Sequence, residues 1–99
     1  MPYFIETFDD PSRAHVRQEA YQAHLDFLAA QAELLLACGA KLDDEEQKTS
    51  GGVYLVDLET RAEAEAFIAK DPFYQHHLFA TVNVTRWRKA YLDGANYLS

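Results

Sequence analysis

Residues 51–73 read GGVYLVDLETRAEAEAFIAKDPF, and they contain one strand, one helix and the break that follows each of them. Residues 53–58 form a short apolar run with β-branched and aromatic side chains, a pattern typical of a strand. Apolar residues occupy both of its alternating faces. We therefore predict a central strand that is covered on both sides.

The helix in this stretch is marked at both ends. Thr60 and Glu63 have the spacing of a capping box, in which Thr60 is the N-cap and Glu63 reaches back to it. Asp71-Pro72 breaks the chain after the helix. The buried side of this short helix is predicted from its apolar residues, Ala64, Phe67 and Ile68.

A strand and a long helix are expected before this stretch. Residues 3–8 mix aromatic, β-branched and polar side chains over the length of a strand, and residues 9–12 (DDPS) end it with helix-starting residues. Residues 13–38 contain no Gly or Pro and consist mainly of good helix formers, and Gly39 then follows as a left-handed C-cap. The predicted core stripe of this helix is Tyr21, Leu25, Leu28, Ala32 and Leu35.

Two more strands complete the pattern. Residues 41–50 are polar and hold the weakest of the predicted strands, and their acidic run, residues 43–46, is expected to be a solvated hairpin or loop. Residues 79–87 alternate apolar and polar side chains, which predicts the last strand. The tail, residues 90–99, contains two tyrosines and two leucines and is too apolar to stay free of contacts.

The predicted order is β–α–β–β–α–β, the ferredoxin-like split arrangement. It is an α+β fold with a four-stranded antiparallel sheet and two helices on one face of that sheet. Ninety-nine residues suffice for one core, so we expect residues 1–99 to form a single domain, with a core over residues 2–89 and a C-terminal tail over residues 90–99.

The second face of such a sheet is left open. Aromatic and apolar residues of the first and central strands would lie on it, in a larger patch than soluble monomers usually expose. Two sheets packed face to face about a twofold axis would cover this patch, so we predict a homodimer. The alternative is that the aromatic residues are exposed singly and need no partner.

Composition and charge exclude several classes of protein. With 48% hydrophobic and 25% charged residues the chain is globular, and its net charge of −7 disfavours a nucleic-acid partner. No segment has the length and apolarity of a membrane span or a signal peptide, so we expect no membrane partner and a cytoplasmic location. Cys38 is the only cysteine, which rules out an internal disulfide and favours a small buried apolar residue.

Several short motifs carry a resemblance to a known family. They are His24-Leu25, Gly39, Gly52, Glu63-Ala64, Asp71-Pro72-Phe73 and Leu78-Phe79, with Arg17 seven residues before His24. Over roughly Pro2 to Lys89, the chain resembles the YCII-related domain family. The resemblance implies a dimeric α+β barrel and a site built around His24 and Asp71. Few members have a known reaction, and the best-understood kind dehydrochlorinates a chlorinated hydroxyhydroquinone.

The residues themselves suggest acid–base chemistry. His24, Tyr21 and Arg17 share one face of the predicted helix. A carboxylate partner such as Asp71 would fix the tautomer of His24 and strengthen it as a base, and we expect their N···O distance to be about 2.7–3.2 Å. Two structural alternatives stay open: Asp71 followed by Pro72 is also a good N-cap, and a half-buried His24 is often a packing residue.

The remaining site predictions concern ligand binding. Arg17 could hold an anionic or enolate oxygen, and Tyr21, Phe73 and His77 are the other candidates for contacts with the substrate. The family usually has a small residue and Gly at His76-His77, and this departure could narrow the pocket. Two adjacent histidines are weak support for a metal site, so none is predicted.

The sequence thus leaves two functions open. The first is a cofactor-independent enzyme that acts on a small aromatic or enolisable molecule by elimination, isomerisation or dehydrohalogenation. No Gly-rich phosphate loop, nucleophile elbow or dinucleotide fingerprint appears, so no cofactor is expected. The alternative is a non-catalytic module that binds a small molecule in the same pocket.

Overall fold

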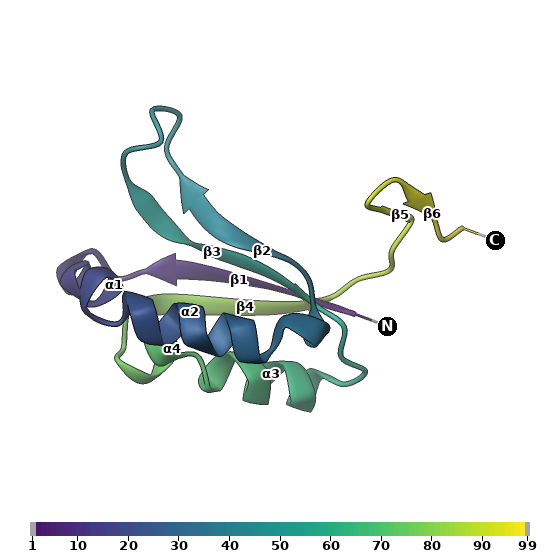
Figure 1. Ribbon diagram of the computed structural model, residues 1–99, viewed down its shortest axis with the longest axis horizontal. Coiled ribbons are helices and arrows are strands. Elements are labelled where there is room, and N and C mark those ends of the chain that lie inside the picture. The colour runs from purple at the N-terminus through teal and green to yellow at the C-terminus, as the bar shows by residue number, and fades with distance from the viewer. Residues whose placement is uncertain (1, 99) are drawn as a thin grey trace.

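The computed structural model describes residues 2–98 and has a ferredoxin-like α+β fold. A sheet with the strand order β2-β3-β1-β4 is antiparallel throughout, and the helices cover one of its faces (Figure 1). The main elements are β1 (Tyr3–Asp9), α1 (His15–Glu19), α2 (Tyr21–Ala30), β2 (Leu35–Leu42), β3 (Thr49–Val56), α3 (Arg61–Ala69), α4 (Pro72–Gln75) and β4 (Phe79–Arg86). Short 3-10 turns lie at Pro11–Arg13 and Ala32–Leu34, and a small hairpin pairs β5 (Tyr91–Leu92) with β6 (Ala95–Asn96).

The boundaries of α3 are those that the sequence predicts. Thr60 is its N-cap, and its hydroxyl accepts a hydrogen bond from the backbone N–H of Glu63 while the Glu63 carboxylate accepts one from the backbone N–H of Thr60. The predicted buried side is confirmed as well, since Ala64, Phe67 and Ile68 are each no more than 5% exposed.

The long helix predicted over residues 13–38 is wrong in two places. Its first part is divided at Ala20 into α1 and α2, and α2 ends at Ala30. Residues 35–42 then form β2, so Gly39 lies inside a strand and is not a C-cap. The reason is tertiary: β2 pairs along its whole length with β3, and this pairing overrides the helix propensity of the Leu-rich segment.

The core stripe of the first helical segment is also shifted from its prediction. Tyr21 and Leu25 are 51% and 37% exposed. The residues that face the sheet are Val16, Ala20 and His24, with Phe27 and Leu28 partly buried. This buried stripe contains a histidine and only two small apolar side chains, Val16 and Ala20. The neighbouring stripe with Tyr21 and Leu25 is more apolar, so it produced the stronger helical pattern in the sequence.

Strand β1 shows which face of the sheet is covered. Tyr3, Ile5 and Thr7 alternate along it and are buried under the helices. Phe4 and Phe8 point to the opposite face and remain partly exposed. In β3, Val53 and Leu55 lie on that same open face and are half-buried, so the prediction of a central strand covered on both sides is wrong for the single chain.

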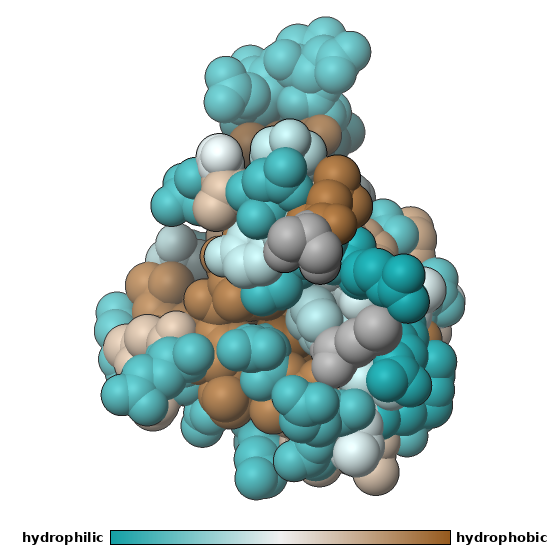
Figure 2. Space-filling view, turned by 90° about the vertical axis from the view of Figure 1, so that its right-hand side faces the viewer, coloured by the Kyte–Doolittle hydropathy of each residue, from teal (hydrophilic) through white to brown (hydrophobic). Residues whose placement is uncertain are grey.

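Two hairpins project from the body of the domain (Figure 1). The hairpin of β2 and β3 ends in residues 43–48, which are all exposed and form a hydrophilic tip in Figure 2. This agrees with the predicted solvated loop. The tail forms the hairpin of β5 and β6, in which Tyr91, Tyr97 and Leu98 are 47–61% exposed. No helix among residues 2–98 is long and apolar enough to cross a membrane.

Candidate active site

The predicted contact between His24 and Asp71 is confirmed. The Nδ1 atom of His24 lies 2.9 Å from each of the two carboxylate oxygens of Asp71. Asp71 is fully buried and His24 is 9% exposed. The two residues are 47 positions apart in the sequence, and the packing of α2 against α4 brings them together.

Asp71 has its predicted structural role at the same time. It is the N-cap of α4, with Pro72 in the first turn, and its Oδ1 accepts a hydrogen bond of 2.9 Å from the backbone N–H of Phe73. The cap fixes the carboxylate at the start of the helix. The capping role and the contact with His24 are therefore two uses of one side chain.

The ring of His24 is held from a second direction by Phe73. The two rings are stacked, with centroids 4.0 Å apart and planes inclined by 14°. Because Asp71 is an acceptor, Nδ1 of His24 carries the hydrogen and Nε2 is left with a free lone pair. The imidazole is thus oriented, with one nitrogen available to act as a base.

Tyr54 is a member of this cluster that the sequence did not point to. Its hydroxyl donates a hydrogen bond of 2.8 Å to Oδ2 of Asp71. Burial, followed by the nearby Asp71 carboxylate, raises the pKa of Tyr54 far above its usual range, so the hydroxyl stays protonated. Only its position in β3, on the same face as the buried Val56, could have indicated this role.

Arg17 lies close to the dyad but has a partner that was not predicted. Its guanidinium donates hydrogen bonds of 2.9 and 3.0 Å to the two oxygens of Asp9, at the end of β1. It also lies over the ring of Phe73, 4.8 Å from the centroid. The bidentate pair fixes Arg17 as an oriented cation beside the dyad.

A cavity of about 210 Å³ opens beside His24, between the α1–α2 segment and the strands β2 and β3. From the helices and α4 it is lined by Arg17, Tyr21, His24, Leu25, Leu28 and Phe73. From the strands it is lined by Cys38, Gly39, Ala40, Gly51, Gly52 and Tyr54. Four of the six predicted site residues therefore line one space, and Asp71 lies buried behind His24.

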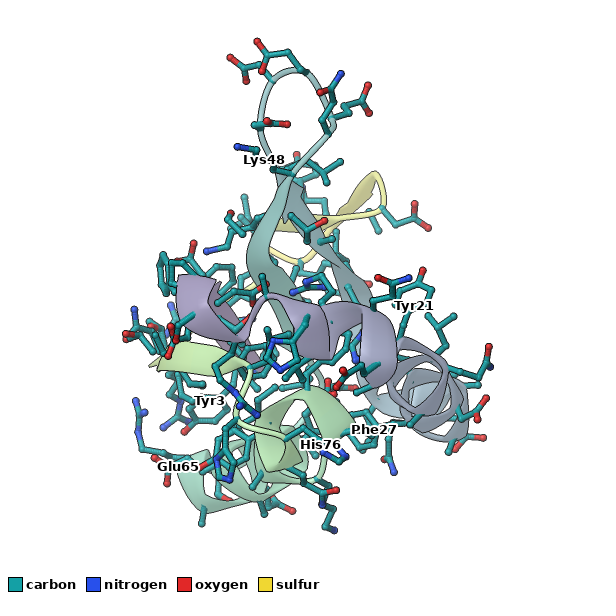
Figure 3. All side chains as sticks on the ribbon, turned by 90° about the vertical axis from the view of Figure 1, so that its left-hand side faces the viewer. Tyr3, Tyr21, Phe27, Lys48, Glu65 and His76 are labelled. Atoms are coloured by element: carbon teal, nitrogen blue, oxygen red, sulfur yellow. The ribbon has the colours of Figure 1, made fainter. Side chains whose placement is uncertain are left out.

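His77 lies elsewhere. It is exposed, has a φ of 62°, and lines a separate hollow with Tyr74 and Phe79. Its neighbour His76 is exposed as well, and Figure 3 shows it apart from Tyr21. Among residues 2–98, no three His, Cys, Asp or Glu side chains are grouped so that they could hold a metal ion.

Cys38 differs from its prediction as a buried apolar residue, because it is exposed in β2 and lines the cavity. Desolvation at this position, followed by the negative charge of Asp71, raises the pKa of its thiol to about 11. The thiol is therefore protonated at neutral pH and is a poor nucleophile.

The fold and the site together define a class of protein. It is a ferredoxin-like domain with a buried His–Asp pair beside a small cavity. Within that class, the chain belongs to the YCII-related domain family, whose family model matches residues 1–88. The tail, residues 90–99, lies beyond the matched residues.

Two of the solved structures that are similar to the chain illustrate the range of likeness. One is a 5-chloro-2-hydroxyhydroquinone dehydrochlorinase from Burkholderia phenoliruptrix in complex with 2,5-dihydroxybenzoquinone, with 28% identity, a TM-score of 0.81, and coverage of 89% of this chain and 94% of that one. The other is a putative antibiotic biosynthesis monooxygenase from Bacteriodes thetaiotaomicron, with 13% identity, a TM-score of 0.56, and coverage of 94% and 91%. The second likeness shows the fold alone. No curated protein gives a significant match.

Proposed function

We propose that this protein is a cofactor-independent enzyme of the YCII-related type that acts on a small aromatic or enolisable molecule. The observation that carries the proposal is the contact of His24 with both oxygens of the buried Asp71, at the wall of a cavity. An oriented imidazole with one free nitrogen, held by a carboxylate, is the equipment of a general base.

In the proposed mechanism, Nε2 of His24 removes a proton from a hydroxyl or an acidic carbon of the substrate. Asp71 stabilises the imidazolium that forms, and it does not itself take the proton. In an elimination, the electron pair that is released moves through the substrate and expels a leaving group such as chloride. An isomerisation would instead return the proton from His24 to another atom of the same substrate.

Arg17 and Tyr21 are proposed to bind an oxygen of the substrate. Arg17 lies at the cavity wall, and Nε and Nη2 of its guanidinium are paired with Asp9. This pairing orients the guanidinium, and the N–H groups of Nη1 are left to donate to an oxygen of the substrate. Phe73 is proposed to contribute an aromatic wall, since it lines the cavity beside His24. His77 is left out of the proposed site because it lines a different hollow.

The size and lining of the cavity support a substrate with a single ring. About 210 Å³, with leucine, phenylalanine and glycine among the lining residues, suits a compact planar molecule better than an extended one. The dehydrochlorinase that is 28% identical to this chain was solved with a one-ring quinone, which supports an aromatic substrate here.

We also propose that the enzyme is a homodimer formed through the open face of the sheet. Phe4, Phe8, Val53 and Leu55 share this face and are at least partly exposed in the single chain. An aromatic and apolar sheet surface of this kind is usually covered by another protein surface. A second copy would cover it with the same residues about a twofold axis.

The test of the enzyme proposal separates binding from turnover. Purified protein is assayed for chloride release from 5-chloro-2-hydroxyhydroquinone and, in parallel, for binding of 2,5-dihydroxybenzoquinone. His24→Ala should retain binding and lose turnover by about 10²–10⁴-fold, the usual contribution of a general base. His76→Ala, which removes an exposed histidine outside the cavity, is the matched control and should change neither. A parent protein that binds the quinone and turns over no hydroxyhydroquinone would favour the non-catalytic module.

A further inference from the structure

The carboxylate of Asp71 is shared among three hydrogen-bond donors. Oδ1 accepts from the backbone N–H of Phe73, Oδ2 accepts from the hydroxyl of Tyr54, and Nδ1 of His24 lies 2.9 Å from both oxygens. Each oxygen therefore has one donor of its own, and His24 competes with both donors for the same negative charge.

Burial makes this competition strong. Asp71 has no exposed surface, so these hydrogen-bond donors take the place of water around the negative charge of its carboxylate. Tyr54 is 2% exposed, and its hydroxyl remains a donor over the whole pH range in which a histidine titrates. In a desolvated cluster, each donor that draws on a carboxylate weakens the interaction of that carboxylate with the others.

We propose that Tyr54 is a positioning residue. Its hydrogen bond to Asp71 weakens the interaction of that carboxylate with His24 and so sets the basicity of His24. The inference rests on the proposed function, because it concerns the proton-transfer step assigned to His24. Tyr54 touches Asp71 and acts on His24 only through it. The hydrogen-bonded chain thus runs from Tyr54 on β3, through Asp71 at the start of α4, to His24 on α2.

The other charged and titratable groups around His24 do not replace this contact. Arg17 on α1 is committed to Asp9 on β1, and its charge is the same with or without the hydroxyl of Tyr54. Cys38 on β2 stays protonated up to high pH and carries no charge in the relevant range. Loss of the Tyr54 hydroxyl on β3 therefore removes one donor from Asp71 and leaves the charges of Arg17 and Cys38 unchanged.

The test replaces the hydroxyl in Tyr54→Phe. With one donor gone, Asp71 interacts more strongly with His24, so His24 should keep its proton to higher pH. The ring signal of His24, followed by NMR against pH and assigned by its loss in His24→Ala, should then change at a pH about one unit above that of the parent, which corresponds to a roughly tenfold stronger hold on the proton.

Tyr3→Phe is the matched control. Tyr3 is also a buried tyrosine on the helix-covered face of the sheet, but it makes no hydrogen bond to the dyad in the part of the chain that the structure describes. This variant should leave the His24 signal at the parent pH even if it lowers stability. A Tyr54→Phe protein whose His24 signal titrates with the parent and with Tyr3→Phe would overturn the inference.

A second measurement keeps the inference testable if Tyr54→Phe does not fold. In protein made with 3-fluorotyrosine, the phenol is more acidic and a stronger donor, so the His24 signal should move to lower pH, and no movement would contradict the inference. Neither measurement needs a substrate. Failure of the proposed function appears as absent turnover, whereas failure of this inference appears as an unchanged titration. Where turnover is found, the acidic limb of its pH profile in Tyr54→Phe should move to higher pH with the NMR signal.

Discussion

Asp71 lies with both carboxylate oxygens 2.9 Å from Nδ1 of His24 while Oδ1 also caps α4. A residue that is needed for a helix start is thereby a fixed partner of a histidine on another helix. The cap stabilises the position of the carboxylate before any ligand binds, which is the preorganisation that an acid–base pair requires. The capping role of Asp71 and its proposed role as the charged partner of His24 can be separated by a substitution that keeps the cap and removes the charge.

Asp71→Asn should separate these two roles. Asparagine is an equally good N-cap, so the backbone N–H of Phe73 keeps an acceptor and the protein should remain folded. The variant lacks the negative charge that stabilises a His24 imidazolium, so turnover should fall by about 10²–10⁴-fold. Asp71→Ala should lose, in addition, about 1 kcal/mol of helix-cap stabilisation. Steady-state kinetics and thermal unfolding measure the two effects, and full activity in Asp71→Asn would contradict the assigned role of the charge.

The thiol of Cys38 should make the folded protein less stable at high pH. Its pKa is raised from 9.0 to about 11 in the folded state, so the folded protein holds a proton that the unfolded chain releases. The contribution to stability is complete below pH 9 and is lost as the pH rises towards 11. Urea unfolding at pH 8, 9 and 10 should show a decline that is smaller in Cys38→Ala.

The same thiol should be alkylated slowly. At pH 8 iodoacetamide should react with the folded protein much more slowly than with the urea-unfolded chain, because the thiolate is the reacting species. Equal rates in the two states would contradict the raised pKa.

Local signals predicted those elements whose residues are adjacent in the chain. The capping box at Thr60, the buried side of α3 and the alternation in residues 79–86 each depend on spacings of a few residues, and each is found in the structure. The strand predicted within residues 41–50 was misplaced, because β2 covers Leu35–Leu42. Its Leu-rich start has helix-forming residues, and its strand conformation depends on pairing with β3.

The central pair of the site could be predicted from the sequence, but the residues that surround it could not. His24 and Asp71 could be paired because each lies at a recognisable helix position within a resemblance to a known family. The partners of those residues could not be predicted, since Tyr54 and Asp9 come from other strands and have no motif of their own. Nothing in the local sequence distinguishes a tyrosine that contacts a carboxylate from one that only packs.

Glycines of the cavity wall should control the size of the ligand. A Cβ atom at Gly52 would lie 3.3 Å from the carbonyl oxygen of Gly39 and 3.5 Å from Cε1 of Tyr54, so Gly52→Ala should fold with a small adjustment and narrow the cavity. Binding of 2,5-dihydroxybenzoquinone should weaken by about 10-fold or more, the effect of one methylene in a tight pocket.

Two other glycines provide the comparison for this change. Gly39 lines the cavity with its backbone, but it pairs with Val53, so a Cβ atom there would lie on the open face of the sheet and would meet no atom within 4 Å. Gly39→Ala should therefore bind the quinone as the parent does. Gly51→Ala would overlap the carbonyl oxygen of Thr7 and should not fold normally. Equal affinities in Gly52→Ala, Gly39→Ala and the parent would indicate that the ligand binds elsewhere. Isothermal titration calorimetry makes the comparison directly.

The acidic tip of the β2–β3 hairpin should do no chemistry. Residues 43–46 are exposed and lie beyond the residues that line the cavity. Asp43 has a structural role, because its Oδ1 accepts hydrogen bonds from the backbone N–H groups of Gln47 and Lys48. A variant with Asn at position 43 and Ser or Asn at positions 44–46 keeps an acceptor in this turn. Its melting temperature and turnover should equal those of the parent, and a large loss of activity would assign a function to the tip.

The proposed dimer should depend on the open face of the sheet. Leu55 lies on this face beside Phe4, in the inner strand β3, and is half-buried in the single chain. Leu55→Asp would place a charge in the interface without entering the core under the helices, so it should shift the protein to monomer. Ala62→Asp, on the exposed side of α3, is the control and should leave assembly unchanged. Sedimentation at micromolar concentration should give twice 11.3 kDa for the parent and the control, and a monomeric parent would refute the dimer.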